Sequence, residues 1–235
     1  MRRFYRQAAV AAGATGYQVL LDGKQLRTPA KAELILPTRA LAEAIAAEWN
    51  SQGEKIEPRG MAFMRLAATA IDRVRPLRPQ VIAEIAAYAG TDLLCYRAAG
   101  PAELIDRQER TWQPLLDWLH QRYDAHLQVT RCVVAVPQSE RSLKALEAAV
   151  AAEDDLTLAG LQALTASLGS LVLALAVRAV RLDIGAAFRA SQLDEDYQAE
   201  RWGLDSEAAA AREALWRDLQ AVGRYLDLLR PPDGI

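Results

Sequence analysis

Four carboxylates in one short stretch, LDEDYQAERWG (residues 193–203), are the residues of this chain best placed to do chemistry. Asp194, Glu195 and Asp196 are consecutive, and Glu200 follows one helical turn after Asp196. Two neighbouring carboxylates can serve as general acid and general base, so a hydrolase that uses Glu195 and Asp196 is one hypothesis. No histidine, metal-ligand cluster or oxyanion donor is signalled beside them, so the sequence favours this hypothesis least.

The same acids have two interpretations that need no catalysis. In a helix that begins near Leu193, the acids Asp194, Glu195 and Asp196 fill the first turn, where the helix macrodipole favours negative charge. Alternatively, the acids select a basic protein partner and Trp202 anchors it, since tryptophan is enriched at the centre of interfaces. Both interpretations stay open from spacing alone.

The way this helix packs must decide which side chains are available. Leu193, Tyr197 and Leu204 roughly share one helical face, and we expect that face to dock on the protein core. Glu195 and Trp202 fall together on a second face. A partner would therefore meet an acid and an aromatic ring side by side.

Other residues that could do chemistry lack the neighbours that such chemistry requires. No GxxxxGK[ST] phosphate loop occurs, and GATG at residues 13–16 is more typical of a hairpin turn. Ser170 lacks the second glycine of a nucleophile elbow, so we expect it to bond the backbone or to allow close helix approach. His120, His126 and Cys132 suggest zinc, but their spacing favours helix-end or surface roles. We expect no catalytic residue, no cofactor and no metal.

Composition is typical of a soluble globular protein with reduced thiols. The 235 residues are 51% hydrophobic and 25% charged, and the formal net charge of −2 gives no basic excess for nucleic acid. Cys95 and Cys132 form no CxxC pair, and Cys95, among apolar neighbours, is expected in the core. The uncharged run Leu156–Val177 could span a bilayer, but its polar residues favour one buried central helix and no membrane insertion.

The first part of the chain predicts β structure. Asp22-Gly23 between two extended runs is a strong hairpin signal, and Glu33–Leu36 is a further strand candidate. After Pro37 the period changes, and Thr38 can cap a helix that ends near Gly53.

From Met61 onward nearly every segment predicts helix. We expect helices over Met61–Val74, from about Val81 to Gly90, and after Pro101, with a kink or break at Pro114. The stretch Leu127–Pro137 is predicted to be extended or strand-like. Further helices are expected to begin near Ser139, Leu156, Asp183 and Asp205, and the last carries a packing stripe of Leu215, Leu219, Val222, Leu226 and Leu229.

These elements predict an α+β fold. We expect a small β-rich N-terminal domain with one or two helices over residues 1–75, followed by a larger helical domain over residues 76–235. The boundary is placed at Arg75-Pro76. We expect a monomer.

Several stretches in order resemble the assembly chaperones of the F-type ATP synthase that hold the free alpha subunit of the catalytic head. They are RFY (3–5), VLLDGKQLRTPAKAELILPTRALAEAIAAEW (19–49), TDLLCYRA (91–98), WQPLLDW (112–118), GSLVLALA (169–176) and LDEDYQAERWG (193–203). Together they cover most of the chain, from Arg3 to about Tyr225. The region from Arg131 to Asp155 matches least, and Ala199 departs from the larger aliphatic residue usual there.

The resemblance implies a small mixed N-terminal domain followed by an orthogonal helical bundle. It also implies a non-catalytic chaperone with no cofactor, whose functional surface is the acidic helix. It implies Glu195 as the first candidate for partner binding, with the surrounding candidates Asp194, Asp196, Tyr197, Gln198, Trp202 and Gly203. The implied partner is the unassembled alpha subunit, held until the beta subunit replaces it. With no secretory signal or transit segment in the sequence, we expect the bacterial cytoplasm, or the mitochondrial matrix for a trimmed eukaryotic chain.

Overall fold

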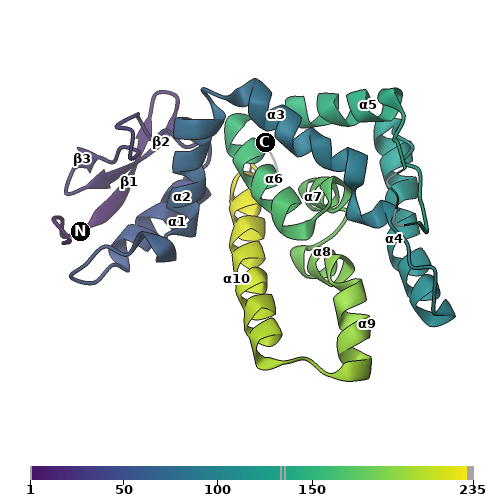
Figure 1. The fold of residues 1–235 in the computed structure, drawn as a ribbon. Helices are drawn as coiled ribbons and strands as arrows, with labels where there is room; N and C mark the ends of the chain where they lie inside the picture. The colour runs from purple at the N-terminus through teal and green to yellow at the C-terminus, as the bar shows by residue number, and fades with distance from the viewer. Residues whose placement is uncertain (1, 133, 135, 232–235) are drawn as a thin grey trace. The chain divides into compact units, whose positions relative to one another are not determined.

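The computed structural model describes residues 2–132, 134 and 136–231 and has the α+β architecture that the sequence predicts (Figure 1). The chain forms two compact units. The first comprises Met1–Arg78, Asp154–Gly160 and Arg224–Ile235, and the second comprises Pro79–Glu153 and Leu161–Gly223. Each unit is described separately below, and the predicted division at Arg75-Pro76 stays a proposal.

A small antiparallel sheet opens the first unit. Within the described residues it has the order β1-β2-β3, formed by Ala8–Gly13, Gly16–Leu21 and Lys24–Gln25. Asp22 and Gly23 join β2 to β3 with φ of 46° and 81°, because a two-residue type I′ turn needs positive φ at both positions. The predicted hairpin is confirmed.

The predicted strand at Glu33–Leu36 is wrong as a strand. Glu33 and Leu36 each make only an isolated bridge, to Arg27 and Tyr17 respectively. The paired Tyr17 and Leu36 exchange backbone hydrogen bonds of 2.8 and 2.9 Å. The segment is extended, but its two bridges go to different parts of the chain, so no continuous ladder forms.

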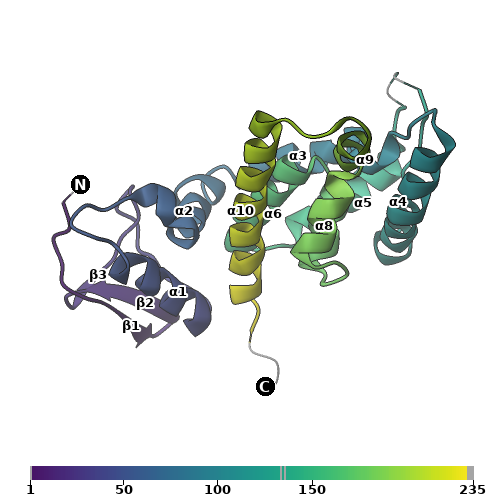
Figure 2. The same cartoon turned by 90° about the horizontal axis from the view of Figure 1, so that it is seen from below.

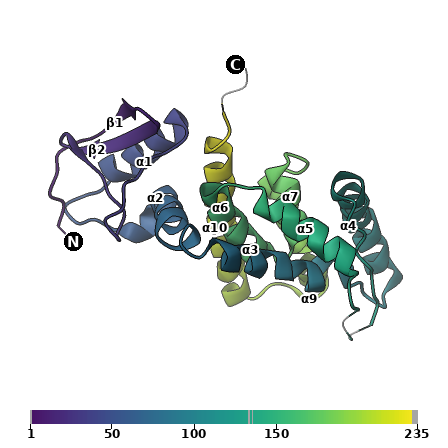
Figure 3. The same cartoon turned by 90° about the horizontal axis from the view of Figure 1, so that it is seen from above.

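Helix α1 (Arg39–Asn50) covers one face of this sheet, as Figures 2 and 3 show. Thr38 caps it as predicted, since its Oγ1 accepts a hydrogen bond from the Leu41 amide at 3.2 Å. Leu41, Ile45 and Trp49 are buried, which places the predicted apolar stripe against the strands. The helix ends at Asn50, earlier than Gly53.

The first unit is completed by helix α2 (Ala62–Thr69) and by two segments from later in the chain, residues 154–160 and 224–235. Helix α2 continues as a π-helical turn over Ala70–Val74, so the predicted helix over 61–74 is present. Arg78 donates a hydrogen bond of 2.7 Å to Asp155. Within this unit the Tyr225 hydroxyl donates to the Leu156 carbonyl at 3.2 Å, which ties the end of the chain to residues 154–160.

The second unit is helical. Its helices are α3 (Arg78–Ala87, of which the first residue belongs to the first unit), α4 (Ala102–Tyr123), α5 (Glu140–Ala151), α6 (Asp155–Leu168, from Leu161 onward), α7 (Leu171–Arg178), α8 (Ile184–Ser191), α9 (Leu193–Trp202) and α10 (Ser206–Leu228, up to Gly223). Short 3₁₀ turns occupy Tyr88–Thr91 and Leu93–Cys95 here, and Pro58–Gly60 in the first unit. The core of the second unit includes Trp112, whose indole nitrogen donates to the Ala190 carbonyl at 2.8 Å.

The predicted single helix over Leu156–Val177 is wrong, because α6 ends at Leu168 and α7 begins at Leu171. Gly169 has φ of 64°, and Ser170 caps α7 by accepting from the Leu173 amide at 3.0 Å. Ser170 also donates to the fully buried Asp92 at 2.8 Å. Within the described residues, no helix is long and apolar enough to cross a bilayer.

Two further expectations differ from the structure. The predicted break at Pro114 is wrong, since helix α4 continues through it, while the alternative of a kink stays a prediction. This proline lies on the exposed face, where water can satisfy the carbonyl that loses its partner. The stretch Leu127–Pro137, predicted to be extended or strand-like, forms no strand in its described residues, and Thr130 makes a parallel bridge to Tyr96. Residues 133 and 135 of that stretch lie outside the described residues.

Candidate partner-binding site

Helix α9 presents the acidic stretch, and two buried side chains fix its orientation. Leu193 and Tyr197 are 8% and 3% exposed, so they dock on the core as predicted. The guanidinium carbons of Arg107 and Arg201 lie 5.2 and 4.4 Å from the centre of the Tyr197 ring. The third expected docking residue, Leu204, is 49% exposed, because the helix ends at Trp202 and Gly203 (φ 81°) turns the chain away.

Two of the four carboxylates are engaged by residues of α4. Asp194 accepts a hydrogen bond of 2.8 Å from the amide nitrogen of Gln108, a side chain that is only 1% exposed. Glu200 pairs with Arg107 at 2.7 Å, and this ion pair raises the pKa of Arg107. These two acids therefore hold α9 against α4.

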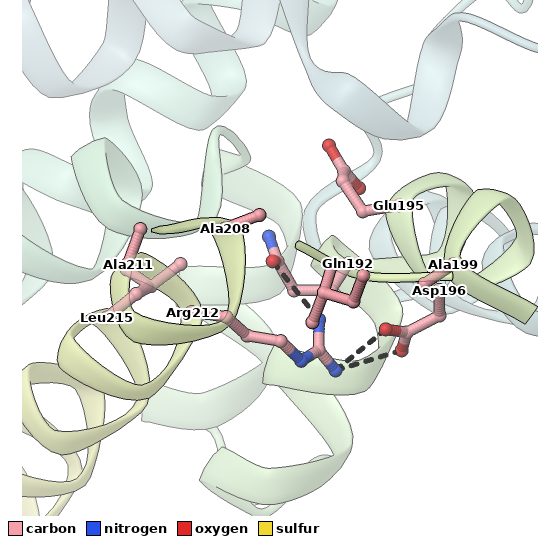
Figure 4. A pocket seen from close by; sticks show the side chains of 9 residues that line it. Gln192, Glu195, Asp196, Ala199, Ala208, Ala211, Arg212 and Leu215 are labelled. Carbon is pink, nitrogen blue, oxygen red and sulfur yellow. Dashed lines mark hydrogen bonds and ion pairs between the residues drawn. The ribbon is translucent and has the colours of Figure 1, made fainter. Parts of the chain in front are cut away.

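Asp196 is engaged by α10. The Nη2 atom of Arg212 lies 2.8 and 3.0 Å from the two carboxylate oxygens of Asp196, and Nη1 donates to Gln192 at 3.2 Å. Figure 4 shows the Arg212 side chain reaching from α10 to both residues. The Arg212 guanidinium also lies 4.7 Å from the centre of the Phe188 ring, so it is held in place from two sides.

Glu195 differs from its neighbours. It is exposed, and within the described part of the chain its carboxylate makes no hydrogen bond or ion pair. An acid in the first turn of α9 gains from the macrodipole, but this gain does not require a partner side chain. Glu195 is therefore the acid of α9 whose charge remains available to another molecule.

A cavity of about 280 Å³ lies between α9 and α10, with Glu195 beside it (Figure 4). Alanine and leucine dominate its wall, and the polar lining residues are Gln192, Glu195, Asp196 and Arg212. The apolar lining residues are Ala199, Leu204, Ala208, Ala211 and Leu215. The small alanine side chains leave the hollow open, and the arginine that crosses it is already neutralised by Asp196.

The other predicted site residues lie at the C-terminal end of α9. Trp202 is 77% exposed, and Leu204 next to it belongs to the cavity wall. Gln198 is exposed, and Gly203 ends the helix with its amide donating to the Ala199 carbonyl at 2.9 Å. A partner on this surface would therefore meet one unpaired acid, one large aromatic ring and a shallow apolar hollow.

The geometry gives the hydrolase hypothesis little support. Glu195 and Asp196 do line one cavity, but Asp196 is paired with Arg212, and the described wall contains no histidine, cysteine or serine side chain. No group of three His, Cys, Asp or Glu in the described residues could hold a metal ion. His120 and His126 meet edge to face with ring centres 5.7 Å apart, while Cys95 is buried and Cys132 exposed.

Sequence reasoning missed the residues that engage the acids. Gln108, Arg107 and Arg212 come from α4 and α10, and the spacing within LDEDYQAERWG contains no information about them. The run of alanines at the start of α10 was a usable signal for the hollow, since small side chains on one helix leave space against the next.

Comparisons with known proteins agree with this architecture. A family model described as ATP12 chaperone protein matches residues 2–120. The crystal structure of Atp12 from Paracoccus denitrificans is 42% identical, covers 97% of this chain and 98% of its own, and superposes with a TM-score of 0.93. The Atu1473 protein of Agrobacterium tumefaciens, described as a candidate chaperone, is 36% identical over 97% of this chain and 86% of its own, with a TM-score of 0.91. The chain therefore belongs to the ATP12 chaperone family, a family of ATP synthase assembly chaperones.

Proposed function

We propose that this protein binds the unassembled alpha subunit of the F-type ATP synthase catalytic head and prevents its aggregation until the beta subunit replaces it. Membership of an assembly-chaperone family supports the general role. The observation that carries the specific proposal is the unpaired Glu195 beside an apolar hollow and the exposed Trp202. That combination can recognise a partially apolar, basic surface of a client.

The chemistry of holding a client requires binding alone. A subunit outside its complex exposes apolar surface that later meets its neighbours, and such surface aggregates. A chaperone that covers it with modest affinity is displaced when the beta subunit offers a larger and better-matched interface. The handover is then driven by a difference in binding free energy, with no nucleotide hydrolysis and no catalytic residue.

In this proposal the residues of α9 have distinct roles. Glu195 pairs with a basic side chain of the client, and Trp202 packs against its apolar surface. Asp194 and Asp196 hold the helix through Gln108 and Arg212, so they present the surface more than they touch the client. Tyr197 is buried and docks α9 on the core, while Gln198 and Gly203 are exposed and lie on the surface that meets the client.

We further propose that the protein acts in the bacterial cytoplasm as a monomer. Both solved relatives come from bacteria, which supports this location.

Co-elution with purified free alpha subunit on size-exclusion chromatography tests the proposal. The parent protein is expected to form a complex, and Glu195→Lys to weaken it about tenfold or more through charge reversal at the contact. Glu147→Lys is the matched control, because Glu147 is an exposed helical acid on α5 that does not line the cavity. Absence of any complex with the parent would reject the alpha subunit as client and leave a chaperone with another client.

A further inference from the structure

A second cavity, of about 470 Å³, lies within the first unit, and no residue of α9 or α10 lines it. Its volume falls in the range that takes one or two side chains of a bound segment. Apolar side chains form most of its wall: Phe4, Tyr5, Leu21, Leu26 and Trp49. The other lining residues are Asp22, Lys24, Gln25 and Arg27.

Two lining residues carry hydrogen-bond donors that the protein does not use. The indole Nε1 of Trp49 and the amide Nε2 of Gln25 are buried and have no hydrogen-bond partner in the described structure. An unsatisfied buried donor costs about 1–3 kcal/mol, so the wall of this cavity carries a cost that the fold itself does not offset. The Tyr5 hydroxyl, in contrast, is satisfied by the Trp49 carbonyl at 2.6 Å.

The charges at the cavity are also unbalanced. Lys24 is exposed and forms no ion pair with any described residue, and Arg27 reaches Glu33 only at 3.9 Å. Asp22, the acid of the cavity, is engaged internally by the backbone amides of Arg6 and Gln7 at 2.9 Å each. The positive charges of Lys24 and of the loosely paired Arg27 therefore remain available to another molecule.

The surrounding unit has the same bias. The first unit contains 15 Lys and Arg against 11 Asp and Glu, although the whole chain has a net charge of −2. A surface of this kind attracts acidic segments and repels basic ones. The unpaired acid of α9 has the opposite preference, so the two surfaces select different parts of a client.

Two features favour an extended occupant. Strand β3 is at the end of the strand order β1-β2-β3, so within the described residues one of its sides has no strand partner, and both its residues line the cavity. Extended segments bind such edges through their backbone and insert alternate side chains into neighbouring pockets. Phe4 is 64% exposed at the same place and offers an aromatic contact.

We propose that this cavity is a second client-binding site, which takes an extended acidic segment of the alpha subunit. One apolar side chain of that segment fills the space between Phe4, Leu26 and Trp49. A neighbouring carboxylate pairs with Lys24 and Arg27, which are exposed at the cavity. The inference rests on the proposed function, because it names a second contact with the same client.

Binding of purified alpha subunit to the intact chain tests this site. Lys24→Glu is expected to weaken binding about tenfold, with most of the effect lost at high salt. Lys55→Glu is the matched control, because Lys55 is also an exposed lysine of the first unit and does not line the cavity. Phe4→Ala should weaken binding about fivefold while unfolding at the same urea concentration as the parent, since the ring is mostly exposed.

The outcomes separate this inference from the proposed function. If the parent binds and Lys24→Glu and Phe4→Ala bind equally well, the second site is wrong and the proposed function stands. Equal losses of affinity for Lys24→Glu and Lys55→Glu would also overturn the second site. They would show that the first unit attracts the client through its overall positive charge and not through a specific site. If the parent does not bind the alpha subunit, both ideas fail. Loss of self-association in Lys24→Glu, with client binding unchanged, would identify a second copy as the occupant and overturn the proposal.

Discussion

The sharpest prediction concerns two adjacent acids of α9 that look equivalent in sequence. Glu195→Gln and Asp196→Asn each remove one negative charge from the same helical turn and keep the size of the side chain. We expect Glu195→Gln to weaken client binding with little change in the free energy of unfolding. Asp196→Asn should mainly lower the free energy of unfolding.

The magnitudes follow from the contacts of each carboxylate. Glu195 is exposed and makes no ion pair with a described residue, so its substitution removes only a macrodipole contribution of about 0.5 kcal/mol. Asp196 lies 2.8 Å from Arg212, and these side chains are 36% and 27% exposed. A hydrogen-bonded ion pair that is partly screened by solvent contributes about 1–2 kcal/mol, and Asp196→Asn also leaves Arg212 without its counter-charge.

Urea unfolding followed by circular dichroism measures the free energy of unfolding, and titration with the alpha subunit measures the affinity for the client. The control is Glu207→Gln, since Glu207 is an exposed acid in the first turn of α10 and reproduces the macrodipole loss outside the cavity wall. Glu195→Gln and Glu207→Gln should unfold at the same urea concentration. If Glu195→Gln is as unstable as Asp196→Asn, or if it binds the client as the parent does, our assignment of roles is refuted.

Three further predictions concern stability and reactivity. Burial raises the pKa of Asp92 to about 6, although hydrogen bonds from Ser170 and backbone amides act in the opposite direction. This group therefore contributes stability that is present at low pH and is lost as the pH rises through 6. In urea titrations the contribution of Asp92 to the free energy of unfolding should grow by about 1 kcal/mol from pH 7 to pH 5, and Asp92→Asn should abolish that growth. If the difference in stability between the two proteins is the same at both pH values, the prediction is refuted. Gly160→Ala should lower the free energy of unfolding by about 1 kcal/mol, because the new Cβ would lie 2.6 Å from Leu226 Cδ2. Equal stability of the variant and the parent would show that the Leu226 side chain moves aside without cost. Cys132 is exposed and should react with a thiol reagent at pH 8. Cys95 is buried, its pKa is raised to about 12, and it should react only when the protein unfolds. Two fast-reacting thiols in the native protein would contradict the packing around Cys95.

Local signals in the sequence predicted the elements well where the chemistry is local. Asp22-Gly23 predicted a hairpin because both positions need positive φ, and Thr38 predicted a helix start because its hydroxyl accepts from an amide three residues later. These interactions close within a few residues, so the sequence contains both partners. The resemblance to ATP synthase assembly chaperones, drawn from ordered stretches, is confirmed at the level of the family.

Predictions failed where a segment depends on distant partners. Leu156–Val177 is an uncharged and largely apolar run, yet the chain turns at Gly169, where Asp92, 78 residues before Ser170, binds the cap of α7. Leu127–Pro137 has β-branched residues, but its described residues form one bridge, at Thr130, since a strand needs a neighbouring strand to pair with. Propensity describes what a segment can form, and packing decides what it does form.

The sequence by itself determined that Asp194, Glu195, Asp196 and Glu200 lie together on one helix, because helical spacing and the macrodipole are local properties. Only the tertiary structure decided which of them is free. The partner of Asp194 is 86 residues away in the chain, that of Glu200 is 93 away and that of Asp196 is 16 away, and no described residue pairs with Glu195. Charge pairing acts through space, so availability for a client is a property of the packed helices and not of the acidic stretch alone.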